Sequence, residues 1–201
     1  MNEENLAWKE VSRTKVFDCR VFSIQESCCV SPRKERRGFS VIDAADWAIV
    51  VPVLAAPGHD MFVMVRQWRH GAQEISLEFP GGVFEPGENP QEAAGRELLE
   101  ETGYRAGKIT KLGEFSPNPA IMSNKVHLFL AEDLADTGRQ NLDADEFVDA
   151  ELMPPEEVIR GMGKPPFIHA LMASALMLYI RHRNIPNSSH REHEGTEDTK
   201  E

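Results

Sequence analysis

The sequence has few cysteines and few basic residues, and each shortage excludes a class of protein. Its 201 residues include three cysteines, at positions 19, 28 and 29. This spacing provides neither a disulfide framework nor a metal-binding motif, so we expect free, reduced thiols. Lysine and arginine number 22 against 33 aspartates and glutamates, which gives a net charge of −11. A general nucleic-acid-binding protein needs a basic face, and this balance argues against one.

A targeting segment and long apolar runs are also lacking. No apolar stretch approaches the roughly 20 residues that span a bilayer, and the opening MNEENLAWKE has no charged and apolar signal region. We therefore expect a cytoplasmic protein that does not associate with membranes. The acidity does not exclude a phosphorylated substrate, because divalent cations can bridge carboxylates to phosphates.

Apolar and β-branched residues in the first half predict β-strands. Residues 15–24 and 38–43 have strand composition, and the charged segment 31–38 between them predicts a turn. Residues 47–56, WAIVVPVLAA, are nearly continuously apolar, which is typical of a central strand buried on both faces. The following PGHD predicts a turn into residues 61–67, which gives a hairpin.

From Asn89 onward the pattern changes to that of a helix. Asn89 is a favourable N-cap, Pro90 suits the first helical position, and Glu92 lies where a capping box places a glutamate. Gly103 is a suitable C-terminal stop. We expect a helix from residue 90 to about 102, with an inward stripe formed by Ala93, Ala94, Leu98, Leu99 and Tyr104.

The remaining sequence alternates between strands and helices. We expect strands at 106–115, 126–131 and 147–152, and helices within 154–162 and 165–183. Strand runs with interspersed helices predict an α/β (α+β) sandwich in which helices pack on a mixed sheet.

Three regions are expected along the chain. Residues 1–45 form an N-terminal antiparallel strand region, residues 46–183 the main domain, and residues 184–201 a disordered polar tail. The tail region contains histidines whose spacing resembles a metal site, but a solvated tail is the preferred interpretation. These histidines are His182, His190 and His193.

The segment 81–104, GGVFEPGENPQEAAGRELLEETGY, concentrates six glutamates and five glycines. On the expected helix Glu97 and Glu101 lie one turn apart, and Glu100 borders the same face. Like charges at this spacing cost a few tenths of a kcal/mol per pair, and partial burial costs far more. A hard divalent cation would reverse that repulsion, and glycines would let a main-chain carbonyl complete its coordination. Composition and periodicity leave a solvated helix face and a metal site as open alternatives.

The same segment resembles, position for position, the signature of the Nudix hydrolases. That signature reads G, five residues, E, seven residues, REU, one residue, EE, one residue and GU, where U is bulky and apolar. The matching residues here are Gly82, Glu88, Arg96-Glu97-Leu98, Glu100-Glu101 and Gly103-Tyr104. The resemblance implies an α/β/α sandwich that hydrolyses a nucleoside diphosphate linked to another group, with Mg²⁺ or Mn²⁺.

The resemblance also implies a role for each position of the signature. Glu97, Glu100, Glu101 and the carbonyl of Gly82 would hold the metal. Arg96 would position Glu97, and Glu88 would orient the loop and helix through hydrogen bonds. Bound metal would neutralise the diphosphate and lower the pKa of a water. A carboxylate would then take the proton of the water that attacks phosphorus.

Residues outside the signature resemble the ADP-ribose pyrophosphatase group. VRQWRHG (65–71) and SLEFPGG (76–82) are similar to patterns that precede the signature in that group. By this similarity Arg69 contacts the substrate, Arg66 is a second phosphate contact, and Glu78 lies near the metal site. Pro119 lies fifteen residues beyond the signature, as a proline does in the group. Where many of those enzymes then have serine and glutamate, this chain has serine and asparagine at 123–124.

Further expectations from that group concern the general base, the adenine site and the oligomer. The base tends to come from a downstream acidic loop, which here is 142–152, with Glu146 as first choice and Asp145 as second. Trp47 or Trp8 could stack on an adenine, although an apolar strand favours a core role for Trp47. Members commonly pair as homodimers through N-terminal strands, here the residues before position 46.

The function favoured by the resemblance is Mg²⁺-dependent hydrolysis of ADP-ribose to AMP and ribose 5-phosphate. Alternative substrates are another nucleoside diphosphate sugar, such as GDP-mannose, or a dinucleotide such as NADH. A sensor that binds a nucleotide sugar without hydrolysing it is a different class, and the complete set of signature carboxylates argues against it. A structural protein with an acidic helix is the third interpretation.

Overall fold

The computed structural model describes residues 3–144 and 146–184, and its centre is a seven-stranded mixed sheet. Five strands follow the order β10-β5-β4-β9-β8, while β6 pairs with β5 and β7 with β4. The pairing of β4 with β9 is parallel, and the other pairings in this sheet are antiparallel. The strands are β4 (Trp47–Ala56), β5 (His59–Arg69), β6 (Glu74–Glu78), β7 (Gly81–Val83), β8 (Tyr104–Phe115), β9 (Val126–Asp136) and β10 (Val148–Met153).

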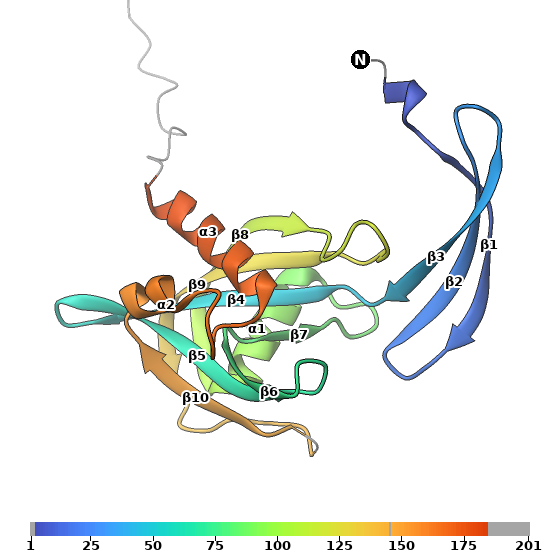
Figure 1. The fold of residues 1–201 in the computed structure, drawn as a ribbon. Coiled ribbons are helices and arrows are strands. Elements are labelled where there is room, and N and C mark those ends of the chain that lie inside the picture. Colours follow the sequence, from blue (N-terminus) through green and yellow to red (C-terminus); the bar gives the residue numbers. More distant parts are fainter. Residues whose placement is uncertain (1–2, 145, 185–201) are drawn as a thin grey trace, which may run out of the picture.

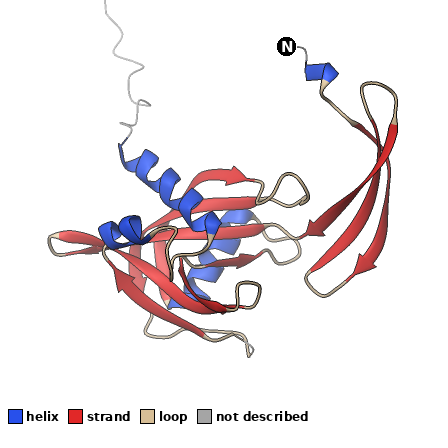
Figure 2. Ribbon diagram, in the orientation of Figure 1, coloured by secondary structure: helices blue, strands red, loops and turns tan. Residues whose placement is uncertain are grey.

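Helices cover both faces of this sheet (Figures 1 and 2). Helix α1 (Pro90–Thr102) packs on one face, and α2 (Pro155–Gly161) and α3 (Ala170–Asn184) pack on the other. The α/β/α sandwich with a mixed sheet is therefore confirmed. The helix expected at residues 90–102 is confirmed as well.

Strand β4 is buried on both faces, as its continuous apolar run predicts. Ile49, Val51 and Val53 join the core that α2 and α3 cover, whereas Ala48 and Val50 join the core under α1. This division follows from the alternation of side chains along a strand. Each buried valine or isoleucine contributes about 1.5–3 kcal/mol to the free energy of unfolding.

The first three strands form a separate antiparallel sheet beside the sandwich (Figure 1). They are β1 (Lys9–Asp18), β2 (Phe22–Val30) and β3 (Arg36–Ala44), and the 3₁₀ helix η1 (Glu3–Asn5) precedes them. Two backbone hydrogen bonds, Ile42 N to Ile121 O and Ser123 N to Ile42 O, tie β3 to the segment before β9. The division of the chain after residue 45 stays a prediction.

Several predicted boundaries are wrong. The single strand expected at residues 15–24 is two strands, because the chain turns between Asp18 and Phe22 without a proline or glycine to mark the turn. The turn expected at 31–38 ends earlier, since β3 already begins at Arg36. Strands β6 and β7 were not expected, because both are too short for a clear alternation.

The last helix also begins later than expected, at Ala170 rather than near residue 165. The preceding Pro166 accepts a hydrogen bond from Leu77 N at 2.9 Å, and Phe167 is buried in the core. These residues are therefore held by β6 and the core, and they cannot continue a helix. None of the helices within the described ranges is long and apolar enough to cross a membrane. The tail from residue 185 onward, with His190 and His193, lies outside the described residues.

Candidate active site

Helix α1 brings the signature glutamates against the sheet. Asn89 caps it, accepting hydrogen bonds from the amides of Gln91 and Glu92 at 3.0 Å, and Gly103 ends it in the left-handed conformation. The inward stripe contains Ala93, Ala94 and Leu98, but it also contains two acidic side chains. These are Glu97, 9% exposed, and Glu101, 4% exposed. The expected Tyr104 lies on β8, where it packs against the same core.

Arg96 is the centre of an ion-pair network that joins the loop to the helix. Its guanidinium donates two hydrogen bonds of 2.9 Å to Glu88, and one each to Glu97 at 2.8 Å and Glu100 at 2.9 Å. A fifth bond, of 3.0 Å, reaches the carbonyl of Val83. Because one arginine holds three carboxylates and a β7 carbonyl, the loop before α1 is held in place relative to the helix.

Burial gives Glu97 and Glu101 unusual acid–base properties. Removal from water raises the pKa of Glu97 to about 7, even though Arg96 opposes that shift. Burial likewise raises the pKa of Glu101 to about 8, against the hydrogen bond of 2.8 Å that its carboxylate accepts from Gly81 N. Two carboxylates that are costly to ionise therefore lie side by side, an arrangement that a cation would stabilise.

The backbone of Gly82 lies directly against the Glu97 carboxylate. A Cβ at this position would lie 2.5 to 2.7 Å from the two oxygens and the carboxyl carbon of Glu97, so a larger residue here would displace that carboxylate. The donor set is all oxygen, which suits Mg²⁺ or Mn²⁺. Within residues 3–144 and 146–184 no three acidic, histidine or cysteine side chains share a metal-binding geometry, and Arg96 is paired with Glu97 and Glu100.

Arg69 and Glu78 form a second ion pair, next to the first. Two hydrogen bonds of 2.8 and 2.6 Å join them, and Glu78 is 3% exposed. Burial alone would raise the pKa of Glu78, but the Arg69 guanidinium holds it below its ordinary value. Arg66 does not join this pair, because it projects from the other face of β5 and bonds Glu151 at 2.6 Å.

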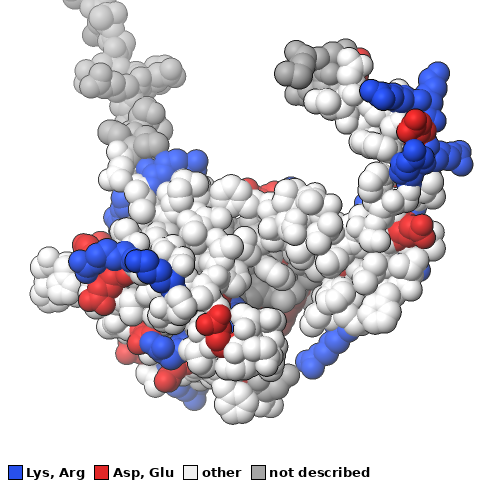
Figure 3. Space-filling model, viewed as in Figure 1, with Lys and Arg blue, Asp and Glu red and all other residues white. Residues whose placement is uncertain are grey.

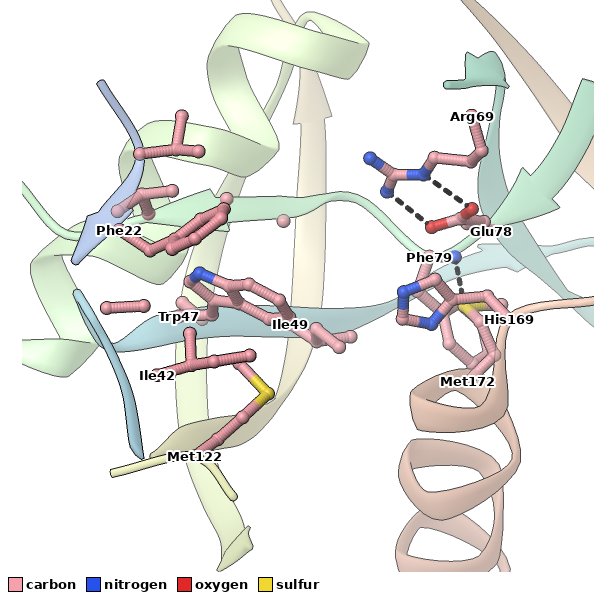
Figure 4. Close-up of a pocket in the computed structure, with 16 residues that line it drawn as sticks. Phe22, Ile42, Trp47, Ile49, Arg69, Glu78, Phe79, Met122, His169 and Met172 are labelled. Atoms are coloured by element: carbon pink, nitrogen blue, oxygen red, sulfur yellow. Dashed lines mark hydrogen bonds and ion pairs between the residues drawn. The ribbon is translucent and has the colours of Figure 1, made fainter. Parts of the chain in front are cut away.

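A cavity of about 450 Å³ opens beside Gly81 and Gly82. Figure 4 shows Phe22, Ile42, Trp47 and Met122 on one side and the Arg69–Glu78 pair with His169 and Met172 on the other. One wall is therefore apolar and aromatic and the other polar. Trp47 lines the cavity and also packs against the main core, whereas Trp8 lies on the outer sheet against Phe39.

The acidic loop before β10 places Glu146 near the helix. Glu146 is exposed, accepts a hydrogen bond from Asp143 N at 3.1 Å, and its charge helps to raise the pKa values of Glu97 and Glu101. The alternative base, Asp145, lies outside the described residues.

Pro119 is not part of the cavity wall. It lies exposed in a turn, and Met122, three residues later, is the residue of this loop that lines the cavity. The next two residues anchor the loop: Ser123 Oγ donates to Asp43 at 2.6 Å, and Asn124 donates to the carbonyl of Ala45 at 3.0 Å. The pair that departs from the resembled group therefore has a structural use here.

The cavity residues that were not predicted from the sequence include Phe22, Ile42, Met122, His169 and Met172. They come from β2, β3, the loop before β9 and the start of α3. No spacing along the chain connects these segments, so no local pattern could have identified them.

This chain is similar in sequence to known proteins. The family model described as "NUDIX domain" matches residues 45–172. The chain belongs to the Nudix family. Among its relatives, a Bacillus subtilis protein named "ADP-ribose pyrophosphatase" is 31% identical over 158 residues, which cover 78% of this chain and 84% of that protein. Escherichia coli "ADP compounds hydrolase NudE" is 31% identical over 168 residues, covering 84% and 86%.

The Nudix fold is also found by structural comparison. A structure titled "Crystal structure of ADP compounds hydrolase" superposes with a TM-score of 0.75 and covers 88% of this chain and 96% of its own, at 24% identity. The protein is thus a Nudix hydrolase, and hydrolases of this family in general need divalent metal cations.

Proposed function

We propose that this Nudix hydrolase cleaves the diphosphate of ADP-ribose, releasing AMP and ribose 5-phosphate, with Mg²⁺ or Mn²⁺. The observation that carries the proposal is the pair of buried glutamates, Glu97 and Glu101, packed against glycine backbone beside a cavity. The names of the relatives from Bacillus subtilis and Escherichia coli support an ADP compound as the substrate class.

The residues present fit the cation that the family needs. Glu97, Glu101 and the carbonyl of Gly82 would hold it, with Glu100 at the border of the same face. The fit rests on oxygen donors, on burial that makes uncompensated charge costly, and on the close approach of the Gly82 backbone to the Glu97 carboxylate. When bound, the cation neutralises the diphosphate, polarises its phosphorus–oxygen bonds and lowers the pKa of a water.

The chain's own residues supply orientation and proton transfer. Arg96 holds the Glu97 carboxylate, and the Gly81 amide holds that of Glu101, so both are preorganised. Arg69 lines the cavity with a partly exposed guanidinium, and the ion pair with Glu78 holds that guanidinium in place. Arg69 would therefore contact the diphosphate of the substrate. Glu146 would take the proton of the attacking water, since its exposed carboxylate lies close enough to influence both buried glutamates.

The cavity would receive the nucleoside half of the substrate. Its Trp47 wall offers the flat apolar surface on which a purine stacks. A ribose 5-phosphate group has no comparable apolar face, so it would lie on the other side of the metal site.

We propose further that the protein is a homodimer joined through its N-terminal sheet. Strand β1 is exposed along its whole length, and large apolar side chains on this sheet are exposed. They are Trp8, Val11, Val16, Phe17, Val21 and Phe39. Such a surface is unusual for a monomer and is the kind that an interface covers.

The reaction can be tested by product analysis. Purified protein should release AMP from ADP-ribose with Mg²⁺ or Mn²⁺ and release none with EDTA. Replacement Glu101→Gln should lower turnover by about 10³-fold, roughly 4 kcal/mol of transition-state stabilisation. The matched control Glu92→Gln, on the exposed side of the same helix, should keep it.

A substrate panel under one metal condition then tests the choice of ADP-ribose. If GDP-mannose or NADH is hydrolysed faster than ADP-ribose, that compound is the preferred substrate and the choice of ADP-ribose is wrong. Metal-dependent turnover retained in Glu101→Gln would refute the assignment of Glu101. Tight binding of ADP-ribose without product over hours would favour a sensor instead.

A further inference from the structure

His169 is the polar cavity residue whose hydrogen-bonding capacity remains unused. Of the ionisable side chains that line the cavity, Arg69 and Glu78 are bonded to each other. The Nδ1 atom of His169 is buried and has no hydrogen-bond partner among the described residues. A buried polar atom without a partner costs about 1–3 kcal/mol, so a ligand that satisfied it would gain affinity.

The position and charge of His169 indicate what kind of ligand group it would bind. It precedes α3 and faces the cavity from the side opposite Trp47 and Phe22 (Figure 4). Burial lowers the pKa of the imidazole, with Glu78 opposing and Arg69 reinforcing that shift. A neutral imidazole has one donor and one acceptor nitrogen. It therefore suits a hydroxyl group, which can both donate and accept, better than a phosphate.

We propose that His169 is a specificity residue that hydrogen-bonds a ribose hydroxyl of the nucleoside in the cavity, and thereby selects ribonucleotides over deoxyribonucleotides. The inference rests on the proposed function for placing a nucleoside in this cavity. With the base on the Trp47 wall and the phosphates at Arg69, the sugar lies between them, next to the polar wall that carries His169. A site built to bond a hydroxyl rejects the analogue that lacks it, because its own polar atom is then left unpaired.

The test combines changes in the ligand with a change in the protein. Calorimetry on the full chain would measure the Kd of AMP, 2′-deoxy-AMP and 3′-deoxy-AMP. Wild-type protein should bind AMP about five- to tenfold more tightly than at least one deoxy analogue. His169→Leu should bind AMP more weakly by the same factor, and should bind that analogue as wild type does. His169→Asn, which keeps an amide near the Nδ1 position, should retain part of the preference.

Controls separate this contact from general damage to the site. His59→Leu, at the exposed first residue of β5, should keep the wild-type preference, and thermal unfolding should show that His169→Leu is folded. Equal weakening of all three ligands by His169→Leu, or a preference that survives in it, would overturn the inference. So would a wild-type protein that does not distinguish the ligands.

The binding test of His169 can fail or succeed independently of the test for ADP-ribose hydrolysis. Hydrolysis of ADP-ribose by a protein whose ribose preference does not depend on His169 overturns this inference alone. A His169-dependent preference in a protein that releases no AMP from ADP-ribose overturns the proposed reaction alone. Wild-type protein that neither binds AMP nor hydrolyses ADP-ribose overturns both.

Discussion

Glu97 and Glu101 lie on the buried face of an α-helix whose other buried residues are Ala93, Ala94, Leu98 and Thr102. Their nearest compensating groups are one arginine and one backbone amide, Arg96 for Glu97 and Gly81 for Glu101. In both cases burial outweighs that compensation, so the pKa values rise to about 7 and about 8. Without a cation these residues therefore reduce the stability of the fold whenever they are ionised.

This burial predicts how stability depends on pH in EDTA. Unfolded Glu101 ionises near pH 4.5, whereas folded Glu101 keeps its proton until about pH 8. Since the folded state then binds more protons, the favourable contribution is complete below pH 4.5 and is lost as pH rises through 8. Glu101→Gln should therefore unfold at a higher temperature than wild type at pH 8, by about 5 °C or more, which corresponds to a few kcal/mol.

The same comparison at pH 5 is the control. There wild-type Glu101 is already protonated in the folded state, so the two unfolding temperatures should nearly agree. Calorimetry at both pH values checks this, and an equal difference at pH 5 and pH 8 would contradict the assignment of the shift to Glu101.

Two adjacent glycines in strand β7 pack against different elements, Gly81 against strand β4 and Gly82 against helix α1. Gly81 packs on strand β4, where a Cβ would lie 2.2 Å from the carbonyl oxygen of Ala48. Gly82 packs on the helix, where a Cβ would meet the Glu97 carboxylate. The first contact is with backbone in a sheet, and the second is with the end of a flexible side chain.

The two glycines should therefore respond differently to alanine. Gly82→Ala should keep the fold, with less than about 1 kcal/mol lost, but displace Glu97 and reduce turnover by about 100-fold. Gly81→Ala should force β7 from β4 and lower the free energy of unfolding by about 3 kcal/mol or more. Urea titration and AMP release measure the two effects. A Gly82→Ala variant with full turnover would show that the Glu97 position is not critical.

On the scale of the whole molecule, the N-terminal sheet lies beside the sandwich with much of its apolar surface uncovered (Figure 1). Basic side chains gather at its outer end, around the turn between β2 and β3 (Figure 3). They are Arg33, Lys34, Arg36 and Arg37. The exposed apolar side chains of this sheet are the surface on which the proposed dimer rests.

The proposed dimer can be tested by light scattering after size exclusion. Wild-type protein should elute with a mass near twice 22.6 kDa. Phe39→Lys, which places a charge on the exposed apolar sheet, should shift the mass toward that of a monomer. The control Met177→Lys changes an equally exposed apolar residue on α3 and should remain dimeric. A monomeric wild-type protein at micromolar concentration would refute the dimer.

The sequence by itself determined the features that depend on nearby residues. Asn89, Pro90 and Gly103 specify where α1 begins and ends, because caps act within one turn of a helix. The apolar run of β4 specifies a strand buried on both faces. The spacing of Glu97 and Glu101 places both on one side of the helix, which makes them candidate metal ligands.

Only the tertiary structure decided what those residues face. It buried Glu97 and Glu101, turned Arg66 away from Arg69, and joined β2, β3 and the start of α3 into one cavity with His169 in its wall. These outcomes depend on contacts between segments far apart in the chain, which the packing of both sheets sets and which local propensity and spacing do not encode.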